Sequence, residues 1–219
     1  MKIVLSVPSY GPVDPQANRH LRVAVMHAAA NGVEWVGDLS PDKMKFDVSR
    51  NVCVQGAIEH PDGADAILWA DSDIILPPNA ITELVAQGKD FICGIYCQRA
   101  KPHWPLIAQF DQIGRHFSWF REWPENAIAP IDGCGFGIVL TSTAMLRTMT
   151  PPWFTFEQFS EDFDFCLRAA AAGYQLYVHT GVLCGHLPDP VPVTVDDFKR
   201  LRDSGGLDTY VPQPVDSAA

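Results

Sequence analysis

The sequence predicts an α/β protein with a mixed sheet flanked by helices. Short apolar runs alternate with amphipathic stretches in the first half of the chain, which is typical of a parallel sheet. The middle of the chain departs from this pattern, because a hairpin signal around Gln112-Ile113-Gly114 adds antiparallel pairing. Hydrophobic residues make up 47% of the 219 positions, which is enough for one sizeable buried core.

The first half of the chain alternates strands and helices. Its expected strands, which are short runs bounded by Pro, Gly or charged residues, are Ile3–Val7, Glu34–Gly37, Ala66–Ala70 and Asp90–Tyr96. Its expected helices are Ala17–Asn31, Ser49–Glu59 and a third that Asn79 caps and that continues to about Gln87. Repeated strand–helix units gather the loops at the carboxyl ends of the strands, where such sheets bind ligands.

The second half of the chain continues with shorter elements. Its expected strands are the hairpin Leu106–Phe110 and His116–Phe120, then Ile138–Leu140, Leu176–Val178 and Val182–Cys184. Ser142 is expected to cap a helix through Met149, and Ser160 a helix over Glu161–Ala172 that Gly173 ends. We expect the main domain to cover residues 1–187. The remaining 188–219 form an extension with a short acidic helix near Val195–Arg202 and a loose tail in the last ten or so residues.

Charge and cysteine usage disfavour several classes of protein. The net charge is −10 and no cluster of Lys and Arg is visible, so tight binding to duplex nucleic acid is not expected. The six cysteines form no CxxC pair, which is typical of buried thiols in a reducing cytosol. No apolar run reaches about 18 residues and the N-terminus has no signal-peptide pattern, so we expect a cytoplasmic protein without a membrane span.

Two aspartates interrupt the most apolar part of the chain. Asp71 and Asp73 follow the run Ala66–Ala70, and because side chains alternate along an extended chain, both carboxylates can face one spot. A divalent cation such as Mg²⁺ or Mn²⁺ would neutralise them and take further oxygens from a substrate's phosphates. Two alternatives stay open here. One is a solvated turn, and the other is a haloacid-dehalogenase type of phosphatase with Asp71 as nucleophile, although that motif usually lies near the N-terminus.

Two later features add candidate catalytic and ligand residues. Glu161 and Asp162 begin a helix after Ser160, where a carboxylate facing a cleft is available as a general base. The alternative is that these acids only complement the helix dipole. His186 closes a short apolar strand. It is either a hydrogen-bonded structural residue or, if the fold brings it to Asp73, a further metal ligand.

Taken in order, these motifs resemble those of the GT-A glycosyltransferases, especially the family 2-like inverting enzymes, over roughly residues 1–187. The motifs are Val7-Pro8-Ser9-Tyr10, Ser49-Arg50-Asn51, Trp69-Ala70-Asp71-Ser72-Asp73, the glycine-rich Asp132–Gly137, Ser160-Glu161-Asp162 and His186. The short chain is similar to small glycosyltransferases of phages and bacteria. The resemblance implies the GT-A fold and a metal-dependent transfer, with inversion, of a sugar from a nucleotide-diphosphate sugar to an acceptor hydroxyl.

The resemblance also implies which residues bind the donor, a UDP- or GDP-sugar. Pro8 and Tyr10 would line the pocket for the nucleotide base at the end of the first strand. Asp38 stands where the family has an aspartate-rich turn and would take its place. Arg50 would contact the nucleotide, and Asp71 the ribose or the sugar.

The reacting centre follows from the same resemblance. Asp73 and His186 would hold Mn²⁺ or Mg²⁺ against the diphosphate. Asp162 would be the catalytic base that activates the acceptor, with Glu161 beside it or on the acceptor. The acceptor itself is not identified by the sequence. A noncatalytic nucleotide- or sugar-binding module on the same fold is a third possibility, and it predicts that Asp162→Asn leaves function unchanged.

Overall fold

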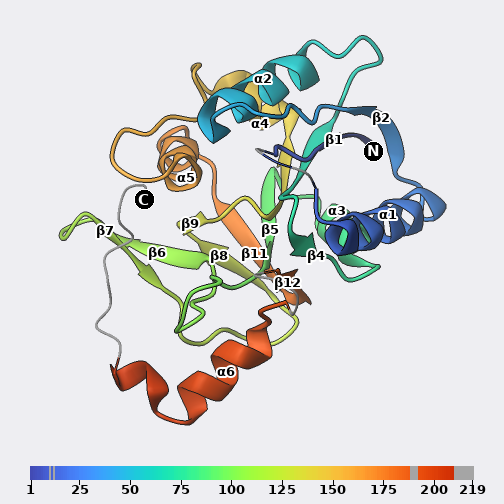
Figure 1. The fold of residues 1–219 in the computed structure, drawn as a ribbon. Coiled ribbons are helices and arrows are strands. Elements are labelled where there is room, and N and C mark those ends of the chain that lie inside the picture. The colour runs from blue at the N-terminus through green and yellow to red at the C-terminus, as the bar shows by residue number, and fades with distance from the viewer. Residues whose placement is uncertain (10, 12, 188–191, 210–219) are drawn as a thin grey trace.

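The protein is a three-layer α/β/α structure, described here by a computed structural model for residues 1–9, 11, 13–187 and 192–209 (Figure 1). Its centre is a seven-stranded sheet with the order β2-β1-β3-β10-β5-β11-β8. The strands are β1 (Lys2–Ser6), β2 (Glu34–Asp38), β3 (Ala66–Ala70), β5 (Phe91–Ile95), β8 (Ile128–Ile131), β10 (Ile138–Ser142) and β11 (Leu176–Leu183). β10 runs antiparallel to β3 and β5, and β8 runs antiparallel to β11. The predicted mixed sheet flanked by helices is therefore confirmed.

Two small sheets accompany the central one. A three-stranded sheet is formed by β6 (Ile107–Asp111), β7 (His116–Trp119) and β9 (Gly133–Cys134), so the predicted hairpin is confirmed. A two-stranded ladder joins β4 (Ile74–Ile75) to β12 (Gly185–His186). Strands of two residues carry almost no local signal, and neither had been predicted as a strand.

Helices cover both faces of the sheet. They are α1 (Pro15–Ala30), α2 (Phe46–Ile58), α3 (Ala80–Ala86), α4 (Thr143–Thr148), α5 (Glu161–Ala171), α6 (Val195–Asp203) and the 3₁₀ helix η1 (Gly206–Thr209). Asp14 caps α1 by accepting the N–H groups of Gln16 and Ala17. The predicted cap Ser142 accepts the N–H of Met145 at 3.0 Å. Asn79 and Ser160 stand at the predicted cap positions of their helices, but their side chains make no capping hydrogen bond.

The apolar side chains of the sheet divide between two cores. Along β3, Ile67 and Trp69 face the core under α2, α4, α5 and α6. The alternate residues Ala66, Leu68 and Ala70 face the core under α1 and α3. This alternation follows from the two-residue repeat of a strand. All five residues of β3 are buried, which explains why its sequence is an uninterrupted apolar run.

Three expectations differ from the structure or fall outside it. Two strands had been predicted over 176–184, but β11 is one strand whose register with β5 shifts between Val178 and Leu183. β8 had been missed, because Pro130 weakens its strand signal and is tolerated there only since β8 is an edge strand. The predicted loose tail lies mostly in 210–219, outside the described residues.

Within the described ranges, no helix combines the length and apolar character needed to cross a membrane.

Candidate functional site

The candidate site lies where β1 and β3 end, at the carboxyl edge of the sheet. Asp71 follows β3 directly, and its N–H donates to the carbonyl of Gly137 at 3.1 Å. β1 is the neighbour of β3, with Ser6 opposite Trp69. Pro8, two residues beyond Ser6, therefore lies at the same edge as Asp71. The donor pocket is predicted at this same edge.

The short ladder of β4 and β12 brings His186 to Asp73. His186 pairs with Ile74, the residue after Asp73, and the N–H of Leu187 donates to the Asp73 carbonyl at 3.0 Å. As a result, His186 Nε2 lies 3.7 Å from Asp73 Oδ1. Two side chains more than a hundred positions apart in the sequence thus face each other, as the metal-site hypothesis requires.

A buried arginine joins the remaining predicted acids. Arg50, on α2, has a side chain only 3% exposed. Its Nη1 lies 2.9 Å from Asp162 Oδ1, its Nη2 donates to Asp71 Oδ1 at 3.3 Å, and its Nε lies 3.7 Å from Glu161 Oε1. Three carboxylates from two parts of the chain therefore share one cation. We call Arg50, Asp71, Glu161 and Asp162 the Arg50 cluster.

Aromatic rings complete the surroundings of Arg50. Its guanidinium carbon lies 4.9 Å from the ring centroid of Phe136 and 5.7 Å from that of Phe154, which are cation–π distances. Burial alone would lower the pKa of Arg50, but the charges of Asp162, Asp71 and Glu161 together raise it. Arg50 is therefore a fixed positive charge that holds the acids in place.

One cation cannot neutralise three carboxylates, and the pKa values reflect this. Burial, followed by the charge of Asp162, raises the pKa of Glu161 to about 9, although Arg50 opposes the shift. Burial also raises the pKa of Asp71, against the opposing effect of Arg50. The side chain of Asp162 accepts the N–H of Phe136 at 3.2 Å, which orients its carboxylate. Glu161 is thus the member of the cluster most suited to carry a proton at neutral pH.

Asp73 and His186 have the donor atoms of a divalent-cation site. Asp73 Oδ1 is a buried oxygen without a hydrogen-bond partner, which is costly unless a further group binds it. His186 Nδ1 lies 2.7 Å from the Cys97 carbonyl, and because a carbonyl can only accept, Nδ1 carries the proton and Nε2 keeps its lone pair. Burial lowers the pKa of His186, which also favours the neutral imidazole. The carboxylate oxygen of Asp73 suits Mn²⁺ or Mg²⁺, and a neutral imidazole nitrogen is a common further ligand of metal ions in proteins.

The two side chains do not make a complete metal site by themselves. In the part of the chain that the structure describes, no group of three or more His, Cys, Asp or Glu residues is arranged to hold a metal ion. A cation at Asp73 and His186 would therefore need oxygens from a bound substrate or from water. Mg²⁺ and Mn²⁺ are commonly bound in this way, by one or two protein side chains together with phosphate oxygens.

Arg99 belongs to the site, although no motif in the sequence points to it. Its Nε donates to His186 Nε2 at 3.1 Å, and its guanidinium forms an ion pair with Asp73 Oδ2. Arg99 stands in an irregular loop after β5, without a motif around it. The contact of His186 Nδ1 with the carbonyl of Cys97, two residues before Arg99, brings this loop to His186.

The other predicted donor-binding residues lie along the same edge. Pro8 is buried after β1, and the predicted contact Tyr10 lies outside the described residues. Asp38 ends β2, is exposed and accepts a hydrogen bond from the Ser40 hydroxyl. Ser40 in turn accepts the N–H of Val7 at 3.0 Å, which ties the end of β2 to the end of β1.

Comparison with known proteins identifies the fold. No protein-family model and no curated protein matches the chain. Among solved structures, A197 from STIV is similar with a TM-score of 0.62 and 19% identity, over 90% of this chain and 92% of that one. GalNAc-T7, solved with UDP, GalNAc and Mn²⁺, is similar with a TM-score of 0.52 and 12% identity, over 92% of this chain. The chain has the GT-A fold.

The similarity to solved structures defines the fold and does not define the reaction. The chain matches 47% of the GalNAc-T7 chain, so it spans about half the length of that protein. The inositol-1-phosphate CTP transferase from T. maritima is similar with a TM-score of 0.51 and 10% identity, over 96% of this chain and 98% of that one. The GT-A fold therefore places the ligand edge, and the site's own residues must carry any argument about the reaction.

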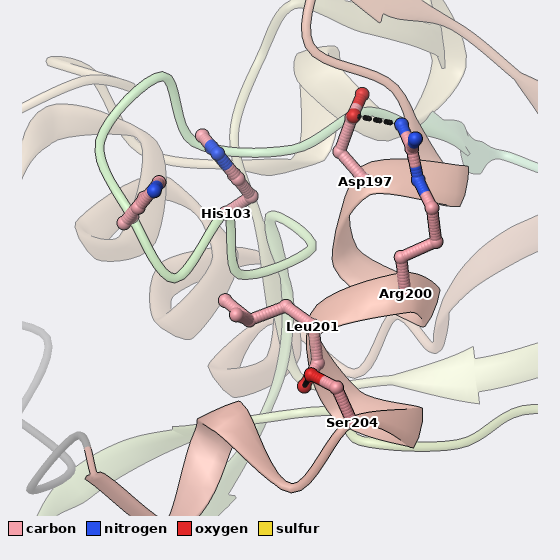
Figure 2. A pocket seen from close by; sticks show the side chains of 6 residues that line it. His103, Asp197, Arg200, Leu201 and Ser204 are labelled. Atoms are coloured by element: carbon pink, nitrogen blue, oxygen red, sulfur yellow. Dashed lines mark hydrogen bonds and ion pairs between the residues drawn. The ribbon is translucent and has the colours of Figure 1, made fainter.

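A hollow of about 360 Å³ lies beside α6, on the far end of the loop that carries Arg99. It is lined by Lys101, His103, Asp197, Arg200, Leu201 and Ser204 (Figure 2). Figure 2 shows His103 on the loop across from Leu201 and Ser204, with Arg200 paired with Asp197. None of these residues contacts the Arg50 cluster in the contacts that the structure describes, so the hollow is not part of the candidate site.

Proposed function

We propose that the protein is a metal-dependent, inverting glycosyltransferase that moves a sugar from a nucleotide-diphosphate sugar to an acceptor hydroxyl. The observation that carries the proposal is the meeting of Asp73 with His186 beside the Arg50 cluster. It brings two candidate ligands for a cation, and a candidate base, to one edge of a GT-A sheet. GalNAc-T7 was solved with UDP, GalNAc and Mn²⁺, which makes a UDP-sugar and Mn²⁺ the first choices to test.

In this proposal the donor lies across the ends of β1, β2 and β3. Pro8, Tyr10 and Asp38 form the pocket for the nucleotide base, and Asp71 positions the ribose or the sugar. Asp73 and His186 hold the cation, which as a Lewis acid stabilises the charge that develops on the diphosphate. Arg50 is too deeply buried for a direct contact to the nucleotide. Its proposed role is therefore to hold Asp71 and Asp162 in position.

Asp162 is the proposed base. The acceptor oxygen attacks the anomeric carbon while the bond from that carbon to the diphosphate oxygen breaks. The proton of the acceptor hydroxyl passes to the Asp162 carboxylate, and the nucleoside diphosphate leaves with its electron pair. Attack from the opposite face inverts the anomeric centre. Glu161, which is buried and held protonated by its surroundings, is proposed to stand beside Asp162 rather than to take the proton.

The test is turnover of a panel of UDP- and GDP-sugars with Mn²⁺, with Mg²⁺ and with a chelator. We expect release of nucleoside diphosphate that requires the cation and that Asp73→Ala reduces to background, because the variant loses a cation ligand. Asp62→Ala, which changes an exposed acid in the turn before β3, is the matched control and should retain full activity. Cation-independent release, or full activity of Asp73→Ala, would refute the metal-dependent mechanism. The anomeric configuration of the product tests inversion.

Nucleotidyl transfer is a second candidate, because the T. maritima CTP transferase shares the fold over nearly its whole length. The products discriminate the two reactions: a nucleotidyltransferase releases pyrophosphate from a nucleoside triphosphate, and a glycosyltransferase releases a nucleoside diphosphate. The phosphatase hypothesis fits the geometry less well, because Asp71 Oδ1 is tied to the Arg50 guanidinium. A noncatalytic module would bind nucleotide with the cation and turn nothing over.

A further inference from the structure

Arg99 binds both proposed cation ligands at once. Its Nε donates to His186 Nε2, the ring nitrogen that keeps a lone pair, and its guanidinium meets Asp73 Oδ2. The Arg99 guanidinium thus contacts His186 Nε2 and the Asp73 carboxylate, which are the groups proposed to bind the cation. The positive charge near Asp73 and His186 is supplied by a side chain of the protein.

The same three side chains differ in their exposure to solvent. Arg99 is 47% exposed, whereas Asp73 is 25% and His186 is 14% exposed. Arg99 is therefore the most accessible member of the group. A long arginine side chain that is half exposed can leave an ion pair at little cost, since water solvates its charge once the pair opens.

The backbone around Arg99 is held by hydrogen bonds that do not involve the Arg99 side chain. The N–H of Gln98 donates to the Trp104 carbonyl at 2.8 Å, and the N–H of His103 donates to the Ala100 carbonyl at 2.9 Å. The His103 ring lies 3.1 Å from the Gln98 carbonyl. Figure 2 shows the compact turn that results beside α6. Arg99 can thus leave Asp73 by side-chain rotation alone.

We propose that Arg99 occupies the place of the divalent cation in the ligand-free protein, and that arrival of the cation releases its guanidinium to bind the donor diphosphate. The inference rests on the proposed function for the identity of the donor. Both positive groups cannot share Asp73 and His186, because like charges at such short range repel. The released guanidinium remains at the same edge, where its planar fork matches two phosphate oxygens.

The first experiment measures Mn²⁺ binding to the full chain without nucleotide, by electron paramagnetic resonance or calorimetry. Arg99→Gln removes the competing charge, so we expect it to bind Mn²⁺ roughly tenfold more tightly than the unmodified protein, within the usual range of coupling between two ligands. Arg22→Gln, which removes an exposed arginine of α1, should leave Mn²⁺ affinity unchanged. Equal or weaker binding by Arg99→Gln would overturn the inference and indicate a structural role for Arg99.

The second experiment measures UDP and GDP binding at saturating Mn²⁺. Here we expect the opposite sign: Arg99→Gln should bind the nucleoside diphosphate roughly tenfold more weakly, because a charge-assisted contact to phosphate is lost. Unchanged affinity for both nucleotides would overturn the diphosphate role of Arg99. These readouts do not depend on turnover. A protein that shows both shifts but transfers no sugar would contradict the proposed function and leave the Arg99 inference standing.

Discussion

Arg50 is the residue on which the geometry of the candidate site depends. It is buried, and it contacts acids that follow β3 and acids that begin α5. A buried cation is stable only when it is well paired, and removing it would leave three carboxylates facing one another. The ionisation of each acid is therefore set by the whole cluster rather than by its own exposure.

Asp162 is the residue whose replacement tests the base assignment. Asp162→Asn keeps the shape of the side chain but cannot take a proton, so transfer should slow by about 10²–10⁴-fold, the usual contribution of a general base. Donor binding with Mn²⁺ should remain nearly unchanged, because Asp162 is not placed on the nucleotide. Steady-state kinetics and UDP calorimetry measure the two effects. Full transfer by the variant would exclude Asp162 as the base, and a retained anomeric configuration would then point to a mechanism without one.

Glu161 should make stability depend on pH. Burial and the charge of Asp162 raise its pKa from an ordinary 4.5 to about 9, so the folded protein binds this proton more tightly than the unfolded chain. The resulting stabilisation is complete below about pH 4.5 and is lost as the pH rises towards 9. Glu161→Gln resembles the protonated form and does not ionise. We expect the variant to gain stability relative to the unmodified protein between pH 5 and pH 9.

The measurement for Glu161 is urea unfolding of both proteins at several pH values. Only the difference between the two proteins is interpreted, because groups outside the Arg50 cluster contribute equally to both curves. Glu157→Gln changes an exposed acid in the loop before α5, and its stability should depend on pH in the same way as that of the unmodified protein. If Glu161→Gln and the unmodified protein lose stability in parallel, Glu161 is already ionised in the folded state.

The start of α5 shows how acids of similar sequence context take different roles. Glu161 and Asp162 face Arg50, whereas Asp164 accepts the backbone N–H groups of Glu157, Gln158 and Phe159. Asp164 thereby closes the loop that leads into the helix. Acids at a helix start can complement its dipole, as the sequence allowed, but the structure gives each of these acids a specific partner.

The loop before α5 should loosen when Asp164 is replaced. Asp164→Asn keeps one carbonyl oxygen but loses the charge that three N–H donors share, so the free energy of unfolding should fall by about 1–3 kcal/mol. Glu157→Gln disrupts only an exposed ion pair with Arg168 and should cost about 0–1 kcal/mol. Urea unfolding compares the two variants. An equal, small loss in both would mean that the loop is held by its aromatic contacts instead.

The elements that could be predicted are those with a long, regular pattern. α1 and β3 follow from apolar spacing alone, and their predicted limits differ from the observed ones by at most two residues. The two-residue strands β4 and β12 could not be predicted. β12 follows β11, so its pairing with β4 depends on where β11 ends in the folded sheet. The same pairing places His186 against Asp73. The sequence named both residues, and their contact required the fold.

For the molecule as a whole, the order of motifs predicted the GT-A fold, but two features of the site stayed hidden. Burial of Arg50 was not foreseen, since a cation near a helix start is usually solvated. Arg99 was missed because a loop arginine has no pattern to distinguish it. Both depend on charges that meet only after distant segments pack together. The spacing of residues in one sequence indicates which of them can share a face of a strand or helix. It does not indicate which charged side chains from distant segments come into contact.

The two cores should unfold together, because the strands between them contribute side chains to both. All six cysteines are buried in these cores and are at most 2% exposed. Burial also raises the pKa of the Cys53, Cys134, Cys166 and Cys184 thiols, and that of Cys97 to about 12. Because all six thiols are buried, they should react with a thiol reagent only after the protein opens. Labelling of the folded protein should therefore be slow for all six, and unfolding in urea should make all six react.

Ligand binding at the carboxyl edge should protect thiols throughout the molecule. A ligand that binds only the folded state at about 100 times its dissociation constant adds about 2.7 kcal/mol of stability, equivalent to roughly a hundredfold fewer open molecules. Mn²⁺ with UDP or GDP should slow labelling of every cysteine by that factor, as followed by mass spectrometry. Mn²⁺ with inorganic phosphate serves as the control and should protect much less. Protection confined to Cys97, in the loop region next to His186, would show that the site opens locally and that the two cores are not one cooperative unit.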